Sequence, residues 1–187
     1  LFFLYSIYGF LLAFGGGIVD TGGEIIFDCE ANIRAYLWLK NFIRTCGINT
    51  ESDFRTERIL FSCKKIAFSI EAPWLKGIVP TLNPDYEPSD LRFFPIPPGP
   101  AGKSASILYN VVLSVFTQSR DTAAACELIR FLTENPEVTR KYYLESGMLP
   151  DSIRQIESDP VFQDDFGILL QQQMKTARPI PSNHPSF

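Results

Sequence analysis

The chain has 187 residues, of which 45% are hydrophobic and 20% are charged, and this composition is that of an ordinary globular protein. The formal net charge is −4 and the charges are interspersed without a basic stripe, which argues against nucleic-acid binding. With one histidine and four cysteines, none in a C-x-x-C pair, we expect no zinc site and no cofactor.

The first fourteen residues are apolar and uncharged. They fit either the hydrophobic region of a secretory signal or a buried helix, and they fall short of the ~20 residues that a membrane span needs. Because no basic segment or small-residue cleavage site accompanies them, we favour a buried helix over 3–14, with sequence missing before it. Gly15–Gly17 end that helix, and residues 18–27 predict a small β-hairpin around a Gly-rich turn.

The middle of the chain predicts two helices and three strands. The apolar stripe over 28–46 indicates an amphipathic helix with Trp38 in the core, and a second helix covers about 53–61. Alternation predicts a strand over 65–70, another short strand covers 91–96, and the β-branched run 108–116 predicts a strand buried on both faces. Cys46 and Cys63 could form a disulfide, with buried free thiols as the equal alternative.

The last third predicts helices. One covers 121–133 after a cap at Ser119 or Asp121, and another begins at Asn135-Pro136 and ends at Gly147. A further helix covers about 160–175, after Asp159-Pro160. The element order is that of an α/β protein, neither a regular βαβ array nor a helical bundle.

Several short motifs follow one another in a distinctive order. They are Gly15-Gly16, the stretch 66–74 that ends in Ala72-Pro73-Trp74, the turn 118–121, the segment 133–137 and Gly147-Met148-Leu149-Pro150. In order and spacing they resemble the family 1 extracellular solute-binding proteins of ABC transporters, the maltose-binding-protein-like family. The sequence departs from the family where Ile107 and Leu108 replace a glycine pair, and where Ala72 replaces the glycine before Pro-Trp.

The resemblance implies a periplasmic-binding-protein-like type II fold, an α/β fold of two lobes that close over ligand by a hinge motion. The chain would be a piece of it, truncated at both ends. Residues 1–107 would belong to the C-terminal lobe, residues 108–152 would cross into the N-terminal lobe, and residues 153–187 would return to the C-terminal lobe.

The same resemblance implies a binding protein, not an enzyme. It would capture a sugar or sugar-like solute between the lobes and deliver it to the membrane subunits of an ABC permease. The protein would be a monomer, periplasmic or otherwise extracytoplasmic, with or without a lipid anchor. Two alternatives stay open: a carbohydrate-active enzyme fragment, which would need two opposed carboxylates, and a non-functional gene fragment.

Four residues are candidates for the ligand site. Trp74 matches a family position that stacks on a sugar ring, and a core tryptophan is the alternative. Tyr5 lies on the first helix, where the family presents an aromatic to the cleft, and Tyr109 begins the crossing strand. Glu71 could accept hydrogen bonds from sugar hydroxyls or be a solvated charge. We find no catalytic constellation.

Overall fold

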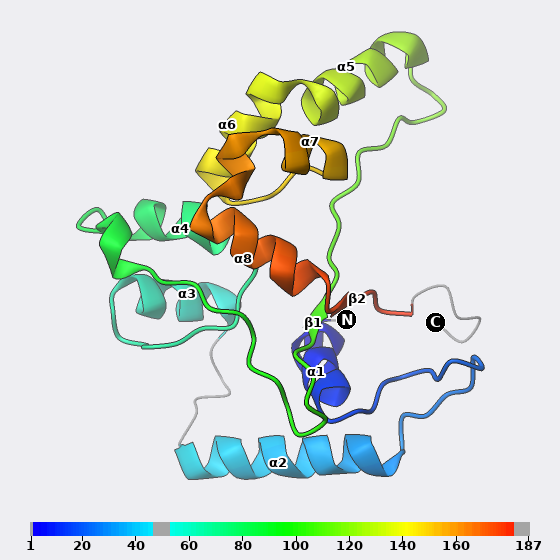
Figure 1. The fold of residues 1–187 in the computed structure, drawn as a ribbon, viewed down its shortest axis with the longest axis vertical. Coiled ribbons are helices and arrows are strands. Elements are labelled where there is room, and N and C mark those ends of the chain that lie inside the picture. The colour runs from blue at the N-terminus through cyan, green and yellow to red at the C-terminus, as the bar shows by residue number, and fades with distance from the viewer. Residues whose placement is uncertain (1, 47–52, 182–187) are drawn as a thin grey trace. The chain divides into compact units, whose positions relative to one another are not determined.

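The computed structural model describes residues 2–46 and 53–181, without the side chains of residues 2–6 and Pro88 (Figure 1). Eight α-helices and two short 3₁₀ helices dominate this part of the chain, and two strands of two residues each accompany them. The elements are α1 (Phe2–Ala13), α2 (Glu30–Cys46), α3 (Phe54–Ser62), α4 (Leu75–Leu82), η1 (Pro88–Asp90), β1 (Ser106–Ile107), α5 (Thr122–Glu134), α6 (Pro136–Ser146), α7 (Ile153–Ser158), η2 (Pro160–Gln163), α8 (Asp165–Met174) and β2 (Ala177–Arg178). Among the described residues, no helix is both long and apolar enough to cross a bilayer.

The chain divides into two compact units. Unit 1 comprises Leu1–Thr50, Phe94–Asn110 and Gln171–Phe187, and unit 2 comprises Glu51–Phe93 and Val111–Leu170. The assignment of residues 1–107, 108–152 and 153–187 to alternating lobes stays a prediction.

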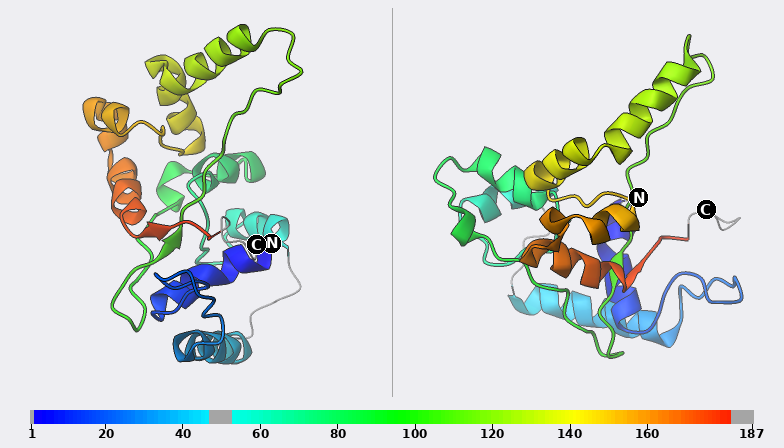
Figure 2. Two further views of the ribbon diagram at one scale, coloured as in Figure 1. Left: turned by 90° about the vertical axis from the view of Figure 1, so that its right-hand side faces the viewer. Right: turned by 45° about the horizontal axis from the view of Figure 1, so that its top comes forward.

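Unit 1 is built around α1, which is apolar on all sides and therefore needs cover on all sides. It packs against α2 and β1, as the two views of Figure 2 also show for the helices. Ile7, Leu11 and Ala35 form the core of this unit together with Tyr8 and Ile18. The predicted helix over 3–14 is confirmed. β1 and β2 pair in parallel, with Ser106 opposite Ala177 and Ile107 opposite Arg178.

Asn32 on α2 fixes the segment that follows α1. Its side chain is fully buried, and its Oδ1 accepts a hydrogen bond of 3.0 Å from the Gly17 N–H. Its Nδ2 donates to the carbonyl oxygens of Gly17, Ile26 and Phe27. The predicted hairpin over 18–27 reduces to one antiparallel bridge, Val19 to Ile25. The hydrogen bonds of the Asn32 side chain therefore hold this segment where strand pairing was expected.

Unit 2 holds two hydrophobic clusters. Leu75, Val79 and Leu91 form the first, and Tyr143, Ile156 and Phe162 form the second. Both are covered further by half-buried aromatic side chains, among them the closely packed pair Phe93 and Phe166, with ring centroids 4.4 Å apart.

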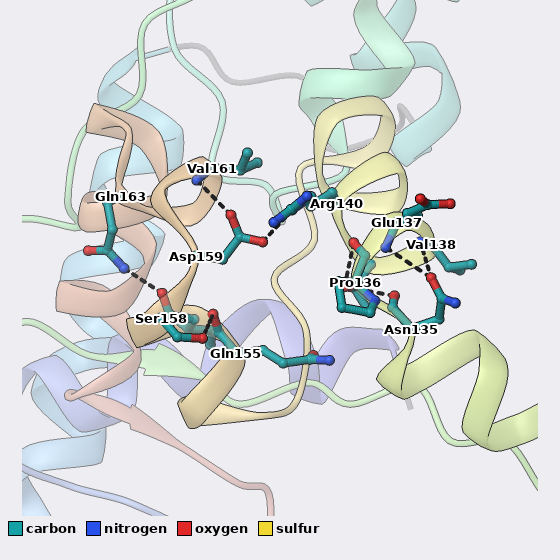
Figure 3. A network of polar contacts seen from close by, with 12 residues as sticks. Asn135, Pro136, Glu137, Val138, Arg140, Gln155, Ser158, Asp159, Val161 and Gln163 are labelled. Atoms are coloured by element: carbon teal, nitrogen blue, oxygen red, sulfur yellow. Dashed lines mark hydrogen bonds and ion pairs between the residues drawn. The ribbon is translucent and has the colours of Figure 1, made fainter.

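Helix α6 begins and ends as its sequence predicts. The Oδ1 of Asn135 accepts hydrogen bonds from the N–H groups of Glu137 (2.9 Å) and Val138 (3.3 Å), as drawn in Figure 3. Pro136 occupies the first turn, where no N–H is required, and Gly147 ends the helix at φ 77°, a left-handed conformation. The same figure shows Arg140 of α6 reaching Asp159, the residue before η2.

The three predicted strands over 65–70, 91–96 and 108–116 are wrong, since these segments are coil in the structure. A strand exists only when a neighbour completes its hydrogen bonds, and the described residues contain a single named strand pair, β1 with β2. Apolar side chains of these segments are consequently exposed, with Phe68 at 84% and Phe116 at 81%.

Three further expectations need correction. Trp38 is 45% exposed rather than buried, and it stacks on Phe42 with ring centroids 5.0 Å apart. Helix α4 was not predicted from the sequence; Pro73 precedes the helix and Pro80 lies in its second half. The four cysteines are free, and Cys46 and Cys63 are exposed, so neither the disulfide nor the burial of these two thiols holds.

Candidate functional site

The four predicted site residues fall into two groups. Glu71 and Trp74 lie in unit 2, before α4, whereas Tyr5 and Tyr109 lie in unit 1. Each group is described within its own unit.

Trp74 occupies the position immediately before α4, with helical backbone angles of φ −60° and ψ −13°. Its carbonyl oxygen accepts hydrogen bonds from the N–H groups of Gly77 (3.0 Å) and Ile78 (3.1 Å), which starts the helix. The next residue, Leu75, is buried in the first hydrophobic cluster of unit 2, while the Trp74 side chain is half-buried. The indole is therefore attached to a fixed turn at the edge of a core.

Two glycines let the end of α6 approach this turn closely. A Cβ on Gly147 would lie 2.6 Å from the carbonyl oxygen of Pro73, and a Cβ on Gly77 would collide with the carbonyl oxygen of Glu145. Real Cβ atoms do not approach other atoms so closely, so the contact between the Trp74 turn and α6 requires glycine at both positions.

Lys76 connects α4 to the second hydrophobic cluster of unit 2, the one that contains Tyr143. Its Nζ lies 5.0 Å from the ring centroid of Tyr143 and 4.8 Å from that of Phe166, within the range of cation–π attraction. The Tyr143 hydroxyl donates a hydrogen bond to Asp164, and burial, followed by that bond, raises the pKa of this tyrosine. The phenol is thus neutral at physiological pH.

Glu71 is neither solvated nor free to reorient. Its side chain is 17% exposed, and its Oε2 accepts a hydrogen bond from Nε of Arg58 on α3. Its Oε1 accepts a hydrogen bond of 3.1 Å from the N–H of Ala72. Arg58 in turn lies over the ring of Phe54, with its guanidinium carbon 5.0 Å from the centroid. The carboxylate is therefore held in one orientation, three residues before Trp74.

In unit 1, Tyr109 follows β1 and is 48% exposed. The backbone beside it is held by the hydrogen bond of 2.9 Å from the Leu108 N–H to the Arg178 carbonyl oxygen. Tyr5 lies on α1, but its side chain lies outside the described residues. No sequence pattern marks Gln173, whose Oε1 accepts a hydrogen bond from the Ile96 N–H and whose Nε2 donates one to the Ser106 hydroxyl.

Sequence reasoning also missed Arg58 and Lys76, which hold Glu71 and the Trp74 turn. Arg58 lies 13 positions before Glu71, on a helix that read only as polar, so no local pattern joins the two residues. Lys76 directly follows the Trp74 motif, but its aromatic partners come from α6 and α8.

The described residues contain no group of three or more His, Cys, Asp or Glu side chains placed to hold a metal ion. Asp164, whose neighbour in the sequence is Asp165, accepts hydrogen bonds from the Tyr143 hydroxyl and from the Gly167 N–H, the latter over 2.7 Å. This carboxylate caps α8 and supports Tyr143. The arrangement around Trp74 is suited to holding a flat, partly apolar ring beside a fixed carboxylate.

No protein-family model matches the chain, and no curated protein matches it in sequence. A solved structure, that of maltose-bound T. maritima MalE3, is similar in fold, with a TM-score of 0.73 and 21% sequence identity. The similarity covers 95% of this chain and 47% of that one, so the chain spans about half the length of the structure it matches. It confirms the predicted fold class: the chain has part of a two-lobe, periplasmic-binding-protein-like fold.

Proposed function

We propose that the chain is part of a solute-binding protein that takes up a sugar or sugar-like solute. The observation that carries the proposal is the rigid, half-buried Trp74 turn in a chain whose fold is similar to that of a maltose-bound protein. A pyranose ring has an apolar C–H face that packs on an indole, and its hydroxyls need fixed polar partners at the edge.

In this proposal, Trp74 stacks on the sugar ring and Glu71, held by Arg58, accepts hydrogen bonds from its hydroxyls. The Glu71 oxygens retain lone pairs beyond those used by Arg58 and Ala72, so the carboxylate can accept a further donor without losing its orientation. Tyr5 and Tyr109 stay predictions as further aromatic contacts of the ligand. The whole protein would act outside the cytoplasm and deliver its solute to an ABC permease without chemical conversion.

The chain's two tryptophans make a direct test. A Trp38→Phe variant leaves Trp74 as the sole indole, and we expect its fluorescence emission to change on titration with maltose. The expected Kd is on the order of 1 mM, because the chain contains only half of the matched fold. Trp74→Phe, which leaves Trp38 alone, is the matched control and should not respond.

Two further measurements separate the proposal from its alternatives. Mannitol, an acyclic polyol with no ring face, should leave the emission of Trp38→Phe unchanged. A response confined to Trp74→Phe, or no response to any sugar in a folded chain, would remove Trp74 from the site. Release of glucose during incubation with maltose would instead indicate an enzyme.

A further inference from the structure

The short segment that carries Glu71 and Trp74 is attached to the rest of unit 2 at both of its ends by cationic side chains. At the first end, Arg58 of α3 donates a hydrogen bond to the Glu71 carboxylate. At the second end, Lys76 lies in the first turn of α4, and its side chain is half-buried. The two ends are therefore attached to different elements, and the orientation of the indole depends on the second attachment as well as on the first.

The glycines around this second attachment permit close contact but supply no attraction. A Cβ on Gly147 would lie 2.6 Å from the carbonyl oxygen of Pro73 and 3.3 Å from the Cβ of Lys76. A glycine has no side chain with which to bind a neighbour, so it only removes a steric barrier. Lys76 supplies the attraction, because its Nζ lies 5.0 Å from the ring centroid of Tyr143 and 4.8 Å from that of Phe166.

Both rings beneath the Lys76 ammonium are fixed by contacts of their own. Tyr143 is fully buried, and its hydroxyl donates a hydrogen bond to Asp164. Phe166 packs against Phe93, with ring centroids 4.4 Å apart. A cation that lies over two fixed rings loses attraction when it moves away from their faces, so the Lys76 side chain is restrained in position.

The backbone transmits this restraint to Trp74. The Lys76 N–H donates a hydrogen bond of 3.1 Å to the Pro73 carbonyl oxygen, and the Trp74 carbonyl oxygen accepts bonds from the N–H groups of Gly77 and Ile78. These bonds close one turn around Trp74, so a shift of Lys76 displaces the indole with it. A binding side chain must be held within ~0.5 Å of its productive position by the residues that support it.

We propose that Lys76 is a positioning residue of the sugar site, whose ammonium, held over the rings of Tyr143 and Phe166, fixes the orientation in which Trp74 meets the sugar. This inference rests on the proposed function, and Lys76 itself does not contact the sugar. The role requires the positive charge: methionine at this position keeps an apolar chain but loses the cation–π attraction, whereas arginine keeps the attraction.

The test compares Lys76→Met and Lys76→Arg in the Trp38→Phe background, where Trp74 is the sole indole. Quenching of its emission by acrylamide without sugar reports how the indole is held, and titration with maltose reports the affinity. We expect Lys76→Met to raise both the quenching constant and the Kd for maltose, the latter by ~3- to 10-fold, as loss of a partly buried cation–π interaction would. Lys76→Arg should retain both values.

Two control variants in the same background separate this role from general effects. Lys141→Met removes a lysine of α6 whose side chain is 74% exposed, and it should change neither value. Val161→Ala removes packing from the second hydrophobic cluster of unit 2 but keeps both rings and Lys76. We expect it to lower the midpoint of urea unfolding and to leave the quenching constant of the folded chain unchanged.

A quenching constant of Lys76→Met equal to that of the background chain overturns the proposal. So does an equal loss in Lys76→Arg, because the charge would then not hold the turn. Weaker maltose binding with unchanged quenching would mean that Lys76 contacts the sugar directly, which also contradicts it. A rise in quenching for Lys76→Met alone, in chains that do not respond to maltose, would support the role of Lys76 in holding Trp74 and contradict only the proposed function.

Discussion

Single polar side chains hold several parts of this protein that regular pairing would hold elsewhere. Asn32 uses one acceptor and both amide hydrogens to fix the chain between Gly17 and Phe27. Glu71 and Asp159 act similarly in unit 2, each through an arginine from another helix. Removing one of these side chains leaves its hydrogen-bonding partners buried and unpaired. The free energy of unfolding then falls by more than the net contribution of the hydrogen bond itself.

Asp159 makes the stability of unit 2 depend on pH. Its Oδ2 accepts a hydrogen bond of 2.5 Å from Arg140, and its Oδ1 accepts one of 3.1 Å from the Val161 N–H. The Arg140 bond is the main cause that holds the pKa of this carboxyl below its ordinary value. The stabilisation is therefore complete above the unfolded pKa, about 4, and is lost as the pH falls through the lower folded pKa.

We expect Asp159→Asn to unfold at lower denaturant concentration than the unsubstituted chain at pH 7, and to lose less stability between pH 5 and pH 3. Urea titrations at several pH values measure both effects. Asp151→Asn changes an exposed aspartate of the same unit and serves as the control. Parallel pH profiles for Asp159→Asn and the unsubstituted chain would contradict the assignment.

At the level of elements, helix ends were predictable from the sequence and strands were not. Asp53, Asn135 and Gly147 act within a few positions of their own helices, so their roles can be read from local sequence. The β-branched run at 108–116 has strand character, but pairing is non-local and its partners are not among the described residues. The same distinction applies to the site: the Pro73-Trp74 turn is a local motif, whereas the contact of Arg58 with Glu71 joins separate elements.

The packing of α4 on α6 should tolerate no side chain at Gly77. Because a Cβ there would collide with the Glu145 carbonyl oxygen, we expect Gly77→Ala to destabilise unit 2 by about 1–3 kcal/mol, as overpacking does. Gly9→Ala is the matched control: it lies within α1, and its Cβ would meet nothing closer than 3.7 Å. That variant should be neutral or gain up to ~1 kcal/mol. Chemical denaturation measures both, and equal effects would contradict the close approach.

Across the whole molecule, stability is concentrated in a few buried clusters while many apolar side chains remain exposed. Phe162 is 1% exposed and lies against Tyr143 in the second cluster of unit 2, whereas Phe116 is 81% exposed. Hydrophobic composition alone cannot distinguish these two positions, because it does not record which surfaces meet a partner.

The same substitution at these two positions should therefore have unequal effects. We expect Phe162→Ala to cost about 3–5 kcal/mol of unfolding free energy, through lost burial and the cavity that remains. Phe116→Ala should change it by less than about 0.5 kcal/mol. Urea denaturation followed by circular dichroism compares them, and a large effect at Phe116 would mean that the segment is covered in solution.

The discontinuous sequence of unit 1 has a consequence for its synthesis. Unit 1 contains residues from both ends of the chain, whereas unit 2 is complete once Leu170 has been made. Ribosomes add roughly 5–20 residues per second, so β1 is made several seconds before its partner Ala177–Arg178. During that interval β1 has no strand partner, and Ile180, which packs against the buried cluster around α1, has not yet been made. Slower translation lengthens the time for which part of the apolar surface of unit 1 has no cover.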